Sequence, residues 1–221
     1  MYQSRVRVAL ILLVPLALWA CSSGRQTFVA KHEPWRAEEE RACLASGAVR
    51  ETPFIATRSS LGGPSACGAI NPFTVSATSS GRVMLDPPAL LRCPMIPAVD
   101  HWMERIVQPA ARYHLRANVI AIKVAGSYSC RPMNHVIGAK LSEHGHANAL
   151  DVAGFVLEGG YIVSVKTGWR GPLPEQNFLR AVHDGSCNVF TTVLGPEYDA
   201  AHRDHFHLDL ARHRAEGRIC K

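Results

Sequence analysis

The chain has 221 residues, of which 47% are hydrophobic, and a formal net charge of +6 at pH 7. Two of the positive charges, Arg5 and Arg7, lie at the amino terminus, so the rest of the chain carries about +4, without dense Lys/Arg runs or interleaved aromatic residues. Because the usual sequence signature of nucleic-acid binding is missing, we do not expect that function. The modest positive charge would suit binding to anionic cell-wall polymers. We expect a monomer.

The amino-terminal residues resemble an export signal. The apolar run 8–20 follows two arginines and is too short for an ordinary membrane span. Leu18-Trp19-Ala20-Cys21 then resembles a bacterial lipoprotein signal, in which Cys21 becomes the lipidated first residue. We therefore expect residues 1–20 to be removed and the protein to be held by lipid on the periplasmic side of a cell-envelope membrane. Soluble export and an uncleaved anchor are the alternatives.

The first half of the remaining chain contains few regular patterns. Residues 21–40 are polar and are interpreted as a tether. Residues 43–98 are rich in Gly, Pro and Ser, which predicts loops with short strands. Residues 99–115 have the apolar spacing of a helix, and Pro109 is expected to kink it. Two aromatic residues of this helix are expected in the core: Trp102 and Tyr113.

The second half predicts strands and helices in irregular alternation. Residues 119–124 alternate as a strand, and residues 149–157 and 161–165 read as a hairpin around Glu158-Gly159-Gly160. A short helix over 174–183 and a strand over 190–194 follow. Without a regular βαβ repeat, the pattern favours one α+β domain over residues 41–221, with a mainly antiparallel sheet flanked by helices.

The cysteines point to an oxidising compartment. Apart from Cys21, six are widely dispersed and none forms a Cys-x-x-Cys pair. Such scatter is poor for a cysteine zinc site and typical of three disulfides, although the sequence does not choose among the pairings. The candidates are Cys43, Cys67, Cys93, Cys130, Cys187 and Cys220.

Two short segments concentrate the chemistry of the chain. Five of the eleven histidines lie in residues 142–151 and 202–209, interleaved with carboxylates. Imidazole and carboxylate are zinc ligands, and a catalytic zinc takes three protein ligands. We predict that His144, Asp151 and His207 hold Zn²⁺. Each segment alone is more often an ordinary polar surface, and the prediction depends on their combination.

The second segment has the alternation of a strand. Phe206 and Leu208 alternate with His205, His207 and Asp209, so period two places the three polar residues on one face. A bound metal would explain why three polar side chains lie on one face of the strand. The other histidines are interpreted as surface or packing residues, although His146 and His202 lie close enough in sequence to support the ligands.

These residues match known motifs. The first segment resembles the Ser-x-His-x-x-Gly-x-Ala-x-Asp motif of the zinc peptidase superfamily that contains D-alanyl-D-alanine carboxypeptidases, lysostaphin-type endopeptidases and the hedgehog fold, with Ala147 in place of its Gly. A closer resemblance, over about residues 43–220, is to the bacterial extensin-like C-terminal domain family. Its marks are Gly126-Ser127-Tyr128-Ser129-Cys130-Arg131, Leu141-Ser142-Glu143-His144, Asp151-Val152-Ala153-Gly154-Phe155, Thr192-Val193-Leu194-Gly195-Pro196 and Asp204-His205-Phe206-His207-Leu208-Asp209-Leu210.

The resemblance implies roles for residues beside the ligands. Carboxypeptidases of the superfamily carry a catalytic glutamate three residues before the last histidine, where this chain has Asp204, and endopeptidases use a His-x-His pair, which His205 and His207 match. We slightly favour His205 to contact the attacking water, with Asp204 as base or orienting group. Arg131 stands where carboxypeptidases hold a substrate carboxylate, and Ser142 is assigned to substrate binding with it.

The resulting hypothesis is an exported zinc hydrolase that cleaves peptide bonds of peptidoglycan, with a hedgehog and D-Ala-D-Ala-peptidase-like fold stapled by disulfides. A cell-envelope binding module that keeps zinc for structure is the alternative. Ala147 in place of Gly, and Asp204 in place of Glu, favour the alternative. The sequence leaves open which bond is cut and which membrane carries the anchor.

Overall fold

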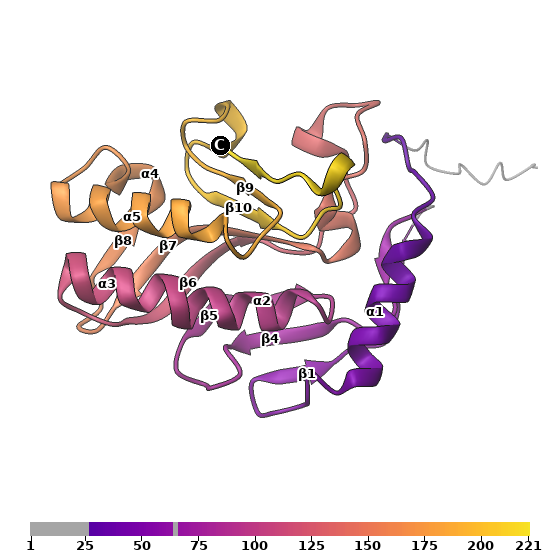
Figure 1. Ribbon diagram of the computed structural model, residues 1–221, viewed down its shortest axis with the longest axis horizontal. Coiled ribbons are helices and arrows are strands. Elements are labelled where there is room, and N and C mark those ends of the chain that lie inside the picture. Colours follow the sequence, from indigo (N-terminus) through magenta and orange to yellow (C-terminus); the bar gives the residue numbers. More distant parts are fainter. Residues whose placement is uncertain (1–26, 64–65) are drawn as a thin grey trace, which may run out of the picture.

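A mixed β-sheet forms the centre of the protein, which a computed structural model describes at residues 27–63 and 66–221 (Figure 1). The expected signal segment 1–20 and its Cys21 lie outside the described residues. Within the described ranges, none of the helices combines the length and the apolar character that crossing a membrane requires.

The main sheet of the described part has the strand order β1-β4-β5-β6-β7-β10-β9-β11, with β8 paired to β7, and β2 and β3 form a separate pair. The strands are β1 (Ile55–Thr57), β2 (Leu61–Gly62), β3 (Gly68–Ala69), β4 (Phe73–Ala77), β5 (Met84–Leu91), β6 (Val119–Gly126), β7 (Ala149–Leu157), β8 (Ile162–Ser164), β9 (Thr192–Leu194), β10 (Phe206–Asp209) and β11 (Ile219–Cys220).

The expectation of a mainly antiparallel sheet is corrected to a mixed one. The β5–β6 and β9–β11 pairs are parallel, whereas β6–β7 and β7–β10 are antiparallel. A parallel neighbour needs a long crossover, and the helical segment between β5 and β6 provides it. The α+β class with flanking helices is confirmed.

The helices cover one face of the sheet, where α3 and α5 pack side by side (Figure 1). The helices are α1 (Pro34–Ser46), α2 (Met95–Trp102), α3 (Gln108–Leu115), α4 (Val165–Gly168) and α5 (Leu173–Ser186). A π-helical turn, Met103–Val107, joins α2 to α3 without a break.

The helix predicted over 99–115 therefore begins earlier, at Met95. The amide of Gln108 bonds to the carbonyl of Met103, which is the wide spacing of a π turn, immediately before Pro109. Trp102 is fully buried, and its indole N–H donates to Ser186 Oγ at 2.7 Å. Tyr113 was expected in the core but is 73% exposed, because the outer face of α3 carries it against the His114 ring.

The predicted hairpin is confirmed as β7 and β8, joined through Gly159 and Gly160. Both glycines have positive φ, +88° and +86°, a conformation that glycine adopts without strain. The strand predicted over 119–124 is β6, and the helix predicted over 174–183 is the longer α5. The strand predicted over 190–194 begins only at Thr192.

The core lies between the sheet and the helices. Phe155 on β7 packs against the rings of Trp102, Phe178 and Phe206, all fully buried. Three disulfides are present as expected, and the pairings are Cys43–Cys93, Cys67–Cys130 and Cys187–Cys220.

The described part of the segment interpreted as a tether, residues 27–40, contacts the domain. Val29 forms a β-bridge with Lys140, and α1 begins at Pro34. The helix is held to the domain because Arg36 forms an ion pair with Glu143, far along the chain. Trp35 and Arg36 lie in the first turn of this helix.

Candidate metal centre

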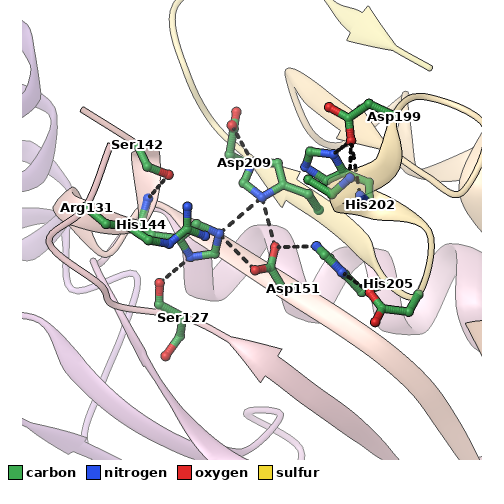
Figure 2. Close-up of polar contacts among 12 residues, drawn as sticks. Ser127, Arg131, Ser142, His144, Asp151, Asp199, His202, His205 and Asp209 are labelled. Carbon is green, nitrogen blue, oxygen red and sulfur yellow. Dashed lines mark hydrogen bonds and ion pairs between the residues drawn. The ribbon is translucent and has the colours of Figure 1, made fainter. Parts of the chain in front are cut away.

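His144, Asp151 and His207 come together at one point of the sheet. Figure 2 shows His144 beside Asp151 there. Asp151 lies on β7 and His207 on β10, and the antiparallel register places the two residues opposite each other. His144 enters from the 3-10 turn Glu143–His146, which precedes β7. One nitrogen or oxygen from each residue lies within 4.8 Å of the others, and all three residues are buried.

The facing atoms are those that a metal would bind. His144 Nε2 lies 3.1 Å from Asp151 Oδ2, and His207 Nδ1 lies 2.9 Å from Asp151 Oδ1. The two imidazole nitrogens are themselves 3.2 Å apart. Two nitrogens and one carboxylate oxygen form the donor set of a catalytic zinc site.

The outer nitrogens of both rings already have partners. His144 Nδ1–H donates to the carbonyl of Ser127, and His207 Nε2–H donates to Asp209 Oδ2 at 2.9 Å. These bonds direct the other nitrogen of each ring toward Asp151. Because ligand type, convergence and outer hydrogen bonds all agree, the residues fit a zinc ion.

The charges around His207 favour a cation. Burial lowers the pKa of His207, but hydrogen bonds to Asp151 and Asp209 outweigh it and raise the pKa to about 10. Burial alone would raise the pKa of the Asp151 carboxyl, yet hydrogen bonds from His144 and His207 hold it well below its usual range. Two buried carboxylates around one imidazole thus create a site that attracts positive charge.

His205 reaches the same centre from the residue before β10. Its Nδ1 bonds to Asp204 Oδ1 at 2.9 Å, and its Nε2 lies 3.6 Å from Asp151 Oδ1. Asp204 therefore stands behind His205, with 58% of its side chain exposed. The hydrogen bond from His205 is the main cause that lowers the pKa of Asp204. His205 faces the centre, and Asp204 orients it.

The loop that carries His144 is held at both ends. Ser142 begins the turn, where its buried hydroxyl accepts a hydrogen bond from the His144 amide. The Glu143 carboxylate accepts hydrogen bonds from the Arg36 guanidinium at 2.7 Å and from the Asn148 side-chain amide at 2.6 Å. Glu143 therefore positions the loop and is not a free carboxylate in the cleft.

Two backbone positions explain small residues of the motif. Ala147 has φ +52° and ends the turn in the left-handed region, which glycine adopts without strain. A Cβ added at Gly126 would lie 2.9 Å from Asp151 Oδ2. Gly126 therefore leaves the room that the Asp151 carboxylate occupies.

Residues 41–221, which contain this centre, match the family described as extensin-like protein C-terminus. The chain belongs to this family. Neither a curated protein nor a solved structure was found to match the chain. The match confirms the extensin-like resemblance read from the motifs.

A second aspartate–histidine pair of this extensin-like domain lies beside the centre. His202 Nδ1 bonds to Asp199 Oδ1 at 2.6 Å, and its ring centroid lies 5.4 Å from that of His205 and 5.8 Å from that of His207. Burial lowers the pKa of His202, although Asp199 opposes the shift. The sequence hinted at His202 by proximity alone.

The centre opens into a cleft of about 1120 Å³. Arg131 lines this cleft and is drawn beside His144 in Figure 2. Its guanidinium donates to the Pro132 carbonyl at 3.4 Å and forms no ion pair with any described residue. Ser142 also lines the cleft, but its hydroxyl oxygen already accepts a hydrogen bond from the His144 amide.

The extensin-like domain contains a second group of metal-type ligands: His183, Cys187 and Cys220. Its two cysteines are joined in a disulfide, so they offer no thiolates.

The hydrogen-bond partners of the outer ring nitrogens of His144 and His207 were not assigned from the sequence. The sequence placed Asp209 on the same strand face as His207 without assigning it as a partner of that ring, whereas the Ser127 carbonyl leaves no sequence signal.

Proposed function

We propose that this extensin-like protein is an exported zinc-dependent hydrolase that cleaves peptide bonds in peptidoglycan, as a carboxypeptidase or an endopeptidase. The observation that carries the proposal is the convergence of His144, Asp151 and His207 at an open cleft, with an oriented histidine beside them. The motif resemblance to zinc peptidases supports the reaction class. The geometry supports the choice of these three residues as ligands and of His205 as the neighbouring histidine.

His144 Nε2, Asp151 and His207 Nδ1 would hold the zinc. A zinc ion bound there would polarise the scissile carbonyl and make the attacking water more acidic. The Ser127 carbonyl and Asp209 keep the two rings in the tautomers that this requires.

His205 is proposed as the proton carrier. Asp204 holds its Nδ1–H, which leaves Nε2 as the basic atom on the side of the centre. Nε2 would accept the proton of the attacking water and deliver it to the leaving amine. Asp204 is thus an orienting residue, a role in which Asp can replace the longer Glu.

Arg131 is proposed to select the substrate. A planar guanidinium without an ion-pair partner among the described residues is suited to a terminal carboxylate, which it binds through two hydrogen bonds. Peptidoglycan stem peptides end in such a group. Ser142 would contribute through its position in the cleft wall.

The location follows from the amino terminus and the cysteines. Three disulfides suit the periplasm, and Cys21 is the proposed site of the lipid that anchors the chain to a membrane of the cell envelope. Peptidoglycan lies in that compartment.

A zinc-containing binding module is the second candidate. It is favoured by one observation: the position of the catalytic glutamate is taken by Asp204, which is exposed and turned onto His205. Such a chain would bind peptidoglycan and leave it intact.

Mass spectrometry of purified sacculi after incubation with the zinc-loaded protein separates the two candidates. We expect new fragments whose peptide stems are shortened or whose cross-links are cut, and no such fragments with Asp151→Ala. Intact stems after incubation with the wild type would establish the binding module instead.

A further inference from the structure

Four exposed apolar side chains form a cluster beside the cleft, which we call the apolar tip: Val29, Met133, Val136 and Ile137. Their exposed fractions are 59%, 49%, 57% and 81%. Soluble proteins rarely leave such a group together at one place on the surface without a partner. None of the four has a part in the metal centre.

The apolar tip is built from two segments that are distant in sequence. The Val29 amide donates to the Ala139 carbonyl at 2.8 Å, and the Leu141 amide donates to the Val29 carbonyl at 3.0 Å. The Gly138 amide donates to the backbone carbonyl of Thr27 at 2.8 Å. The first described residues therefore form an edge of the loop 133–141, and Figure 1 shows the indigo start of the described chain beside the salmon loop.

The shape of the loop is fixed, so the exposure is a property of the fold. Asn134 and His135 both have positive φ, +51° and +58°. The Asn134 side chain donates to Asp199 at 3.1 Å, which ties the loop to the turn before β10. The bond from Asn134 fixes the loop against that turn, while Val136 and Ile137 stay exposed.

Most of the charged side chains around the apolar tip are basic, and the acid that contacts the loop, Asp199, is paired with His202. Lys31 and Lys140 are exposed beside it, and Arg131 lies at its base. Residues 27–32 and 131–141 contain no Asp or Glu. Glu33, the nearest acid in sequence, is paired with Arg36. An apolar group with a basic surround has the composition of a surface that binds anionic lipid.

The distance to the proposed anchor is short. The chain between Cys21 and Thr27 spans at most about 20 Å when fully extended. A lipid on Cys21 would therefore keep the apolar tip within reach of the membrane surface at all times.

We propose that the apolar tip docks on the anionic lipid surface of the membrane that carries the anchor, with Val136 and Ile137 among the acyl chains and Lys31 and Lys140 at the headgroups. The inference rests on the lipid anchor of the proposed function. Docking would place the mouth of the cleft beside the membrane, because Val29, Met133 and Lys140 also line the cleft.

The experiment uses the full lipidated protein in vesicles of phosphatidylethanolamine and phosphatidylglycerol with brominated acyl chains, which quench nearby tryptophan. The variants are Ile137→Trp and, as a matched control, Tyr113→Trp, which is 73% exposed on α3, far from the loop in Figure 1. We expect bromolipid to reduce the emission of the added tryptophan in Ile137→Trp only. Lys31→Gln with Lys140→Gln should weaken that reduction.

Unquenched emission from Ile137→Trp, or equal quenching at both positions, would overturn the inference. Shielding of Ile137→Trp that depends on protein concentration without vesicles would overturn it in favour of a second copy of the chain. A Cys21 without lipid, seen by mass, would also overturn it. None of these outcomes bears on hydrolysis of sacculi, so the zinc hydrolase proposal stands or falls separately.

Discussion

His207 donates through Nε2 to Asp209 at 2.9 Å, while its Nδ1 faces Asp151 at the same distance on the other side of the ring. One imidazole is thus held between two buried carboxylates. Asp151 is a proposed ligand, and Asp209 fixes the tautomer and the orientation of the ring. The side chain of His207 is buried, with about 10% of it exposed.

Asp209→Ala should weaken zinc binding about 10–100-fold, the usual effect of removing the partner of a ligating histidine. Asp204→Ala is the matched control, because it also removes an aspartate bonded to a histidine but leaves His207 in place. Competition with a fluorescent chelator gives both affinities. Equal affinities in the two variants would contradict the role of Asp209.

The three proposed ligands should each be needed for full zinc content. His144→Ala, Asp151→Ala or His207→Ala leaves two ligands, which are too few to hold the ion firmly. His101→Ala, an exposed histidine on α2, should keep the wild-type content. Elemental analysis of the purified variants measures the stoichiometry, and full occupancy in all three ligand variants would remove the assignment.

His205→Ala should retain zinc and lower hydrolysis of peptidoglycan peptides by roughly 10²–10⁴-fold, the usual share of general acid–base catalysis. Asp204→Asn should cost less, because it leaves the imidazole in the cleft and changes only its orientation. Rates and zinc content are measured on the same preparations. A larger loss in Asp204→Asn would make Asp204 the base.

Arg131→Ala should lower kcat/KM for peptides with a free terminal carboxylate by about 10–100-fold, which corresponds to a lost charge-assisted hydrogen bond. Internal cross-links, which lack that carboxylate, should be cleaved at nearly the wild-type rate. Arg170→Ala, an exposed arginine outside the cleft, is the control. Equal losses on both substrate classes would assign Arg131 to the structure of the cleft.

Glu40→Gln should change how stability depends on pH. Burial raises the pKa of Glu40 and outweighs the backbone amides of Ile70 and Asn71 and the charge of Arg92. The folded state therefore binds a proton more readily than the unfolded state, so the wild type gains stability as pH falls through the raised pKa.

The neutral Gln should make the variant more stable than the wild type at neutral pH, with an advantage that shrinks toward about pH 4, near the usual range of a glutamate. Urea unfolding at both pH values, with disulfides intact, measures the difference. A variant that is less stable at neutral pH would show that the charge of Glu40 is needed by Arg92.

The sequence indicated the residues of the centre because their signals are local. Alternation around His207 and the small residues between His144 and Asp151 are visible in the chain itself. The role of Asp204 behind His205, and of Arg36 on Glu143, depends on side-chain contacts that spacing does not describe.

Part of the fold was hidden by prolines. Strand β5 lies in the region predicted as loops with short strands, because Pro87 and Pro88 interrupt it. The structure tolerates them because the β6 ladder pairs residues 84–86 and the β4 ladder pairs residues 89–91, so neither proline has to donate a ladder hydrogen bond. The parallel pairing of β5 with β6 follows from the helical crossover between them, and no local pattern specifies which strand that crossover leads to.

The ion pair between Arg36 and Glu143 has a practical consequence for where the protein can be cut. The family match begins at residue 41, but the folded unit does not. A fragment trimmed to the matched boundary would lose the guanidinium that holds the His144 loop and the strand partner of Lys140. Recombinant versions for crystallography or assays should therefore start upstream of Val29.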